Sequence, residues 1–170
     1  APLRADALAF SSYTAEHNAL EMEKVGAVPV VLRFGAFYGP EERQTRRILR
    51  WAKLGFFLMA GPPEGYYPMV HLSDAAEAVL RALRAPAGVW NIVEDEPFTR
   101  RQSAEALARA MGKKSLSPPS PWMALLLRPD KAPCESLRVL NRKFKKATGW
   151  SPAFPSPWEG WTAVVLQASR

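Results

Sequence analysis

Tyr13 and His17 lie four residues apart near the start of the sequence. On a helix this spacing places both side chains on one face. A phenol can exchange a proton with a substrate, but its ordinary pKa near about 10 makes it a poor general base at neutral pH. A neutral imidazole beside it offers a hydrogen bond and little electric field. Either the pair takes part in proton transfer, or Tyr13 packs in the core and His17 lies at the surface.

A second candidate group is a set of basic residues in one predicted helix, at positions 43, 46, 47, 50 and 53. Arg43, Arg47 and Arg50 share a face there, and the arginine fork binds phosphate well. The functional interpretation is a clamp for a diphosphate or a nucleotide, with Arg43 and Arg47 as substrate-binding residues. The alternatives are a solvated helix face and a nucleic-acid patch. Nucleic acid is not expected as a partner, because the sequence carries no recognisable motif for it.

His71 and Asp74 stand where a predicted strand passes into a predicted helix. Glu77 follows Asp74 by three residues, which is the spacing of a capping box, so the simplest expectation is that Asp74 is the N-cap. His71 is a candidate substrate-binding residue. Its alternative is a histidine that packs or forms a hydrogen bond inside the fold.

Composition argues against several classes of protein. The 170 residues carry a formal net charge of +7, two histidines and a single cysteine, Cys134. One cysteine excludes an internal disulfide framework, and this histidine and cysteine content argues against a closed zinc site, so no metal is expected. No apolar run approaches the roughly 18 residues of a membrane span, and we expect a cytoplasmic protein. The sequence also lacks the G-x-G-x-x-G and phosphate-loop motifs.

The elements that must position these residues alternate along the chain. Strands are predicted over 28–34, 56–60, 66–72 and 89–93, and helices over 13–25, 41–53, 74–84 and 99–112. Such alternation is typical of an α/β fold with a partly parallel sheet. Leu137, Leu140 and Phe144 predict a further helix that ends at Gly149, and another begins near residue 157. We therefore expect an α/β region over 1–112 and a helical lobe over 113–170.

Five segments in order resemble the C-terminal half of the extended short-chain dehydrogenase/reductases, the group of NAD(P)-dependent sugar epimerases and dehydratases. The segment 13–21 resembles the active-site helix Y-x-x-x-K, and 30–40 resembles the strand and turn that follow it. The segment 69–78 is similar to V-H-x-x-D-x-A-x-A, and 89–97 is similar to N-I-x-x-x-E-P. The segment 141–152 is similar to N-x-K followed by G-W-x-P.

The resemblance implies a partial Rossmann-like sheet with a small helical substrate-binding lobe. It implies hydride transfer with NAD or NADP at a sugar-nucleotide-like substrate, and it makes Tyr13 the acid/base. The lysine that the family places beside the tyrosine, where it stabilises the phenolate and holds the cofactor ribose, is His17 here. The backbone of Arg33, Phe34 and Gly35 would face the nicotinamide, at the strand end where open α/β sheets bind ligands.

In this family the dinucleotide-binding half precedes the tyrosine helix, whereas only twelve residues precede Tyr13. We therefore expect a fragment, a truncated gene product or one half of a two-chain assembly, inactive by itself. An apolar sheet edge left open by the missing half would favour a homodimer or strand exchange. The alternative function is a non-catalytic remnant or a binding module for a phosphorylated ligand.

Overall fold

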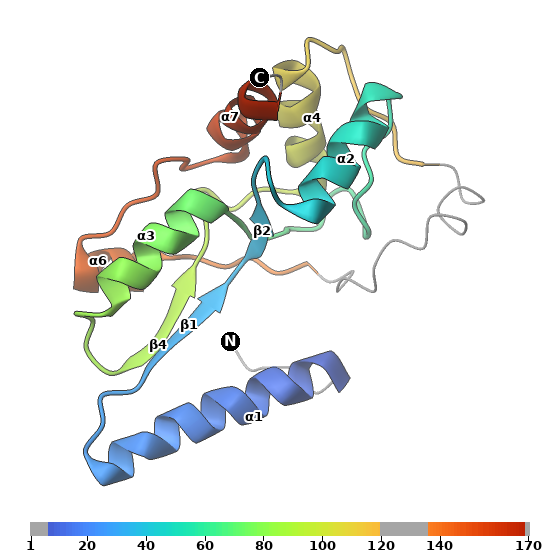
Figure 1. The fold of residues 1–170 in the computed structure, drawn as a ribbon. Coiled ribbons are helices and arrows are strands. Elements are labelled where there is room, and N and C mark those ends of the chain that lie inside the picture. Colours follow the sequence, from blue (N-terminus) through green and yellow to red (C-terminus); the bar gives the residue numbers. More distant parts are fainter. Residues whose placement is uncertain (1–6, 120–135, 169–170) are drawn as a thin grey trace.

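The computed structural model describes residues 7–119 and 136–168 (Figure 1). Cys134 lies outside these residues, and so does most of the segment 113–133. The helices and strands are α1 (Ala7–Glu21), the 3-10 helix η1 (Met22–Val25), β1 (Val30–Phe34), β2 (Ala36–Tyr38), α2 (Arg43–Lys53), β3 (Met69–His71), α3 (Leu72–Ala82), β4 (Gly88–Ile92), α4 (Arg100–Ala110), α6 (Arg142–Thr148) and α7 (Pro157–Ala168).

The strands form two short parallel sheets that share one continuous stretch of chain. β1 pairs with β4, with Val30 opposite Gly88, and β2 pairs with β3. At Gly35 the chain passes from one sheet to the other: its N–H donates to the Ile92 carbonyl, and the next N–H donates to the Pro68 carbonyl. A Cβ at Gly35 would lie 2.9 Å from the Pro68 oxygen, so this close approach of two backbones requires glycine. The predicted α/β class with a partly parallel sheet is confirmed.

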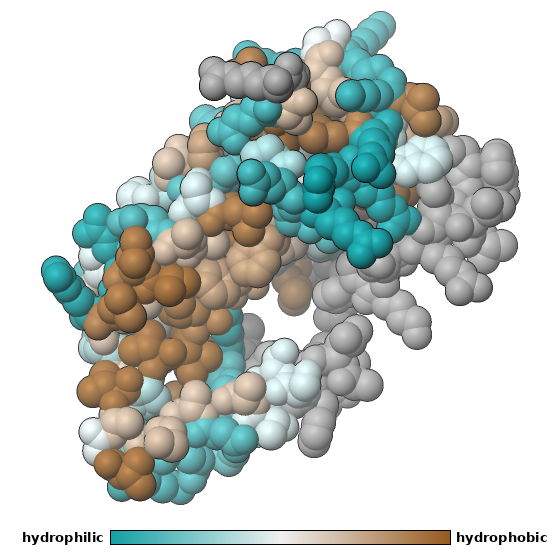
Figure 2. Space-filling model, viewed as in Figure 1, coloured by the Kyte–Doolittle hydropathy of each residue, from teal (hydrophilic) through white to brown (hydrophobic). Residues whose placement is uncertain are grey.

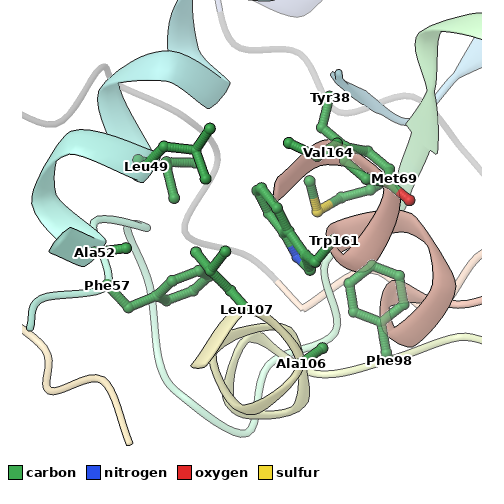
Figure 3. Packing of buried hydrophobic residues seen from close by; sticks show 11 residues of the cluster. Tyr38, Leu49, Ala52, Phe57, Met69, Phe98, Ala106, Leu107, Trp161 and Val164 are labelled. Atoms are coloured by element: carbon green, nitrogen blue, oxygen red, sulfur yellow. The ribbon is translucent and has the colours of Figure 1, made fainter. Parts of the chain in front are cut away.

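Two apolar clusters hold the molecule together. One lies between β2, α2, α4 and α7, where Leu49 and Leu107 face Trp161 (Figure 3). The other lies on one face of the β1–β4 sheet and includes Val70, Ile92, Phe144 and Trp150. Because side chains alternate along a strand, Val30, Leu32 and Phe34 all pack on this second cluster, and Arg33 lies on the opposite face.

The helices begin where short-range hydrogen bonds satisfy their free N–H groups. Thr99 and Gln102 form the predicted capping box of α4. At α2 the Glu42 carboxylate accepts from the N–H groups of Gln44 and Thr45. α1 lies apart from the other helices (Figure 1) and is fastened to β1 by Glu16, whose oxygens accept from Arg33 at 2.5 and 2.9 Å. The hydrogen bond with Glu16 is the main cause that raises the pKa of Arg33.

The capping prediction at Asp74 is wrong. Helix α3 begins at Leu72, and its N-cap is His71, whose Nδ1 accepts from the Ser73 N–H. The buried Asp74 carboxylate instead accepts from the N–H groups of Ala153 and Phe154, at 2.8 and 3.0 Å. Asp74 thus ties the segment after α6 to the start of α3, a contact across about eighty residues that no local pattern could indicate.

Several predicted boundaries also differ from the structure. The first helix begins at Ala7 and not at residue 13. No strand forms over 56–60, where Phe56 makes only an isolated bridge with Ser117, and the strand predicted over 66–72 is reduced to β3. Leu137 and Leu140 precede α6 and are exposed, so only Phe144 of that predicted stripe is helical and buried.

Gly160 of α7 gives a direct test of this packing. A Cβ there would overlap the Tyr38 hydroxyl and lie 2.6 Å from its Cζ. We expect Gly160→Ala to lower the free energy of unfolding by about 1–3 kcal/mol or more, because overpacking a filled core strains it. Urea denaturation measures the change. Thr162→Ala, at an exposed position of the same helix, is the control, and equal losses in the two variants would contradict the packing described here.

Candidate functional site

A small pocket lies just beyond the carboxyl end of β4. Three segments form its walls: 66–69 before and at the start of β3, 93–98 after β4, and 137–139. The third segment is held by the Leu137 N–H, which donates to the Tyr66 carbonyl at 3.1 Å. The Arg138 guanidinium lies 5.6 Å above the Tyr66 ring. Ligands of open α/β sheets bind outside the carboxyl ends of the strands, so this is the expected position for a ligand.

Glu94 lines this pocket and is buried, with 2% of its surface exposed. One of its oxygens, Oε1, accepts a hydrogen bond from the Tyr38 hydroxyl, and Oε2 has no partner among the described residues. The pKa of Glu94 is raised, mainly by burial. The hydrogen bond from Tyr38 lowers this pKa, whereas the charges of Asp74, Glu159 and Glu96 raise it further. Burial and Glu94 likewise raise the pKa of Tyr38. Both groups therefore release their protons at a higher pH than the free side chains do.

His71 is also buried and lies behind Tyr38. Its Nδ1 is 2.8 Å from the Ser73 hydroxyl oxygen, and its ring lies 4.4 Å from the Phe154 ring and 5.3 Å from the Tyr38 ring. Burial lowers the pKa of His71, and Asp74 opposes this in part. Since Nδ1 accepts from the Ser73 N–H, Nε2 carries the proton of the neutral ring. His71 is thus packed and hydrogen-bonded inside the fold, and it is not among the residues that line the pocket.

Tyr13 and His17 lie on one face of α1, as their spacing predicts. Their rings are nearly parallel, at 6°, with centroids 6.4 Å apart. Both are exposed, Tyr13 by 54%. No residue of α1 lines the pocket after β4, so the described residues alone do not bring the tyrosine and the pocket together.

The predicted cofactor-binding residues lie where β1 ends. The Arg33 side chain is engaged by Glu16, the Phe34 ring lies 5.2 Å from the Phe37 ring, and Gly35 faces the backbone of β3. Each of the three thus has a contact within the chain. Their role toward the nicotinamide stays a prediction.

The predicted phosphate clamp on α2 is not part of the pocket. Arg43 is exposed and Arg47 is half-buried, and neither lines the pocket. Over residues 7–119 and 136–168, no group of histidine, cysteine and carboxylate side chains is arranged to hold a metal ion. Within the same ranges, no helix has both the length and the apolar character that crossing a bilayer requires.

Sequence reasoning missed Tyr38 and Glu94, which organise this region. One signal was present: Glu94 directly follows the predicted strand 89–93, and a carboxyl group at the end of a parallel strand is a candidate ligand contact. Nothing in the sequence indicated that Tyr38, 56 residues earlier, would donate to it.

Comparison with solved structures identifies the fold. The chain resembles the human epimerase family protein SDR39U1 (isoform 2) solved with NADPH, with 25% identity, a TM-score of 0.69, and coverage of 81% of this chain and 48% of that chain. It resembles UDP-N-acetylglucosamine 4-epimerase from Bacillus cereus, with 21% identity, a TM-score of 0.76, and coverage of 100% and 57%. It also resembles UDP-glucose 4-epimerase from Thermotoga maritima solved with UDP-glucose, with 23% identity, a TM-score of 0.72, and coverage of 95% and 52%.

The chain spans about half the length of the solved structures that it matches. No family model matches the sequence, and no curated protein matches it significantly. The fold that the five sequence segments indicated is therefore confirmed by structure rather than by close sequence relatives.

Glu94→Gln tests the buried carboxyl. Below the ordinary glutamate pKa of about 4.3, both folded and unfolded chains keep the proton, and the residue has no effect on pH dependence. Above it the unfolded chain loses the proton first, so the wild type should lose up to about 1.4 kcal/mol of stability per pH unit relative to Glu94→Gln until the raised pKa is reached. Urea unfolding from pH 4 to pH 8 measures this, and comparison at each pH cancels the contribution of His71.

Glu96→Gln is the matched control, since Glu96 lies two residues away and is exposed. A constant difference between wild type and Glu94→Gln across the pH range would mean that Glu94 is ionised in the folded protein.

Proposed function

Because the chain has the fold of the C-terminal half of the extended short-chain dehydrogenase/reductases, we propose that it is the substrate-binding half of an NAD(P)-dependent nucleotide-sugar epimerase, dehydratase or reductase. A dinucleotide-binding half, in the same polypeptide or in a second one, would complete it. The observation that carries this proposal is the open edge of β1 beneath the helix that bears Tyr13.

The two edges of the β1–β4 sheet are unlike. The outer edge of β4 is covered by α6 and the residue before it: Lys143 Nζ donates to the Val89 carbonyl at 3.4 Å, and Asn141 Nδ2 donates to the Val93 carbonyl at 2.8 Å. At the other side, β1 pairs with no second strand among the described residues. The N–H and C=O groups of the odd-numbered residues around β1 point toward β4. The N–H and C=O groups of Val30, Leu32 and Phe34 point the other way, where a further strand could pair with them.

A parallel strand added there would continue the sheet below α1 and would bring a second strand end close to Tyr13. The Glu16–Arg33 ion pair holds α1 over β1 and so fixes the height of Tyr13 above that edge. Tyr13 would be the acid/base that gives a proton to, or takes it from, the reacting substrate oxygen. Its exposure leaves room for a partner surface and for a ligand.

Within this chain, the residues that would contribute to a cofactor site lie on α1 and at the end of β1. The exposed Tyr13 and His17 are free of packing by the core, so they fit a site beside the nicotinamide and its ribose. A bound nicotinamide would supply hydride transfer. The side chain of Arg33 is occupied by Glu16, so the contribution of Arg33, Phe34 and Gly35 would come from their backbone, and the added half would hold the rest of the dinucleotide.

The pocket after β4 would form one part of the nucleotide-sugar site, since its empty volume of about 210 Å³ is below the roughly 300–1,000 Å³ of a typical ligand pocket. It combines a position at the carboxyl ends of the strands with an arginine stacked on a tyrosine, and Glu94, whose pKa is raised by burial, lies in its wall. A protonated carboxyl can donate a hydrogen bond to a neutral oxygen of a ligand. These features support a substrate with polar, uncharged groups, as a sugar or a base presents.

A binding module without redox chemistry is the second candidate. It is favoured by His17, which stands where the resemblance places an ammonium group. A neutral imidazole gives little of the field that an ammonium applies to a phenolate. The experiments below separate the two.

The open β1 edge predicts self-association of the isolated chain. Unpaired N–H and C=O groups along a strand bind a second strand readily, and here they adjoin partly buried apolar side chains. We expect sedimentation velocity to show dimers or larger species whose fraction increases with concentration. A single monomeric species at high concentration would contradict an edge left open for pairing.

Activity should be tested in the complete protein from its source cells, after its intact mass has shown whether the second half is in the same polypeptide. With NAD(P)H and UDP-sugars as probes, Tyr13→Phe should lower kcat about 10²–10⁴-fold, as expected for loss of an acid/base, with cofactor affinity unchanged. Saturable NAD(P)H binding without turnover in the wild type would favour the binding module. Absence of NAD(P)H binding would overturn the proposal.

His17→Lys tests how the tyrosine is activated. An ammonium about 4 Å from the phenol, at an effective dielectric of about 20, favours the phenolate by about 4 kcal/mol. The rate should therefore reach its plateau at a pH lower by up to about 3 units. His17→Gln, which keeps a neutral side chain, is the control. Identical pH profiles for wild type and His17→Lys would mean that position 17 does not influence the reacting group.

A further inference from the structure

Helix α2 carries a straight row of positive charge on its outer face. Arg43, Arg46, Arg50 and Lys53 follow one another at intervals of three and four residues, and all are exposed. At 1.5 Å per residue the row is about 15 Å long. The buried residues of α2 occupy the opposite face: Thr45, Ile48, Leu49 and Ala52. Figure 2 shows the strongly hydrophilic surface that results over α2.

This row lacks compensating charge within the part of the chain that the structure describes. None of its four side chains takes part in an ion pair there. The carboxylate nearest in sequence, Glu42, is engaged in capping α2, and Glu41 precedes it at the same end. At the opposite end Lys113, which lies sixty residues away in the sequence, docks its Nζ on the Lys53 carbonyl at 3.1 Å and adds a further positive charge.

The packing of α2 argues for a polyanion and against a membrane surface. A helix that binds at a bilayer surface must bury an apolar face in the lipid. The apolar face of α2 is already used, since Leu49 and Ala52 point into the core toward Phe57 and Trp161 (Figure 3). Only the basic face is available to a partner, and no residue of α2 lines the pocket after β4.

We propose that this row, Arg43–Arg46–Arg50–Lys53, binds the phosphate backbone of a nucleic acid without sequence preference. One strand of a duplex presents a phosphate about every 3.4 Å along the axis, so about four phosphates match the length of the row. The arginine fork suits phosphate oxygens. The sequence predicted no nucleic-acid partner because it lacks a recognition motif, but contacts to the phosphate backbone need no such motif. This binding is independent of the proposed redox function.

The test is fluorescence anisotropy with a labelled duplex of about 20 base pairs, between about 50 and 200 mM NaCl. Four phosphate contacts predict a slope of log affinity against log salt of about −3.6, and Arg43→Gln/Arg46→Gln/Arg50→Gln should reduce its magnitude by about 2.7. The matched control is Arg84→Gln/Arg142→Gln/Lys146→Gln, which removes three exposed charges from α6 and the end of α3 and leaves the same net charge of +4 (7 − 3).

The control variant should retain the wild-type slope, and circular dichroism should show that both triple variants are folded. Equal loss of binding in the two variants would mean that net charge alone acts, and it would overturn the proposal. So would the absence of duplex binding at the lowest salt concentration, or binding only to vesicles rich in phosphatidylserine. If the α2 variant loses affinity for UDP-sugar and the wild type binds no DNA, the row is a diphosphate clamp instead.

Discussion

The hydrogen bond between Tyr38 and Glu94 joins two parts of this molecule that lie 56 residues apart in the sequence. Tyr38 ends β2, and Glu94 follows β4, so the bond closes the gap between the two short sheets. The Tyr38 ring lies 5.2 Å from the Trp161 ring, and its hydroxyl fills the space that a side chain at Gly160 would need. Helix α7 can therefore approach the sheets only because Tyr38 points at Glu94 and residue 160 has no Cβ.

This arrangement has an electrostatic consequence for Glu94. Its burial, together with the nearby carboxylates Asp74, Glu159 and Glu96, raises the pKa of Glu94. Asp74 itself accepts from two backbone N–H groups. A polar, hydrogen-bonded cluster thus occupies the place where an apolar core would be expected, next to the pocket. Buried polar groups in such a position are a common mark of a binding site.

The helices differ in how extensively they pack on the rest of the molecule. α2, α4 and α7 share one apolar cluster, to which α1 does not contribute among the described residues, and the Glu16–Arg33 ion pair joins α1 to β1. The same β1 has one edge without a strand partner among the described residues. Both facts concern one surface. It is the surface at which the proposed function places the dinucleotide-binding half.

The sequence by itself determined the features that depend on neighbours within a few residues. Residue spacing predicts the Thr99–Gln102 capping box and the amphipathic helix α2, because capping bonds and helix faces involve residues three or four apart. The short apolar run of β4 likewise predicts a strand. The order of five segments also indicated the family fold. The tertiary structure decided the rest: that Asp74 binds backbone N–H groups about eighty residues away instead of capping α3, that His71 takes over the cap, and that Leu137 and Leu140 stay outside α6. At Asp74, two long-range hydrogen bonds outweighed a local capping preference of about 1 kcal/mol, and such contacts leave no periodic trace in the sequence.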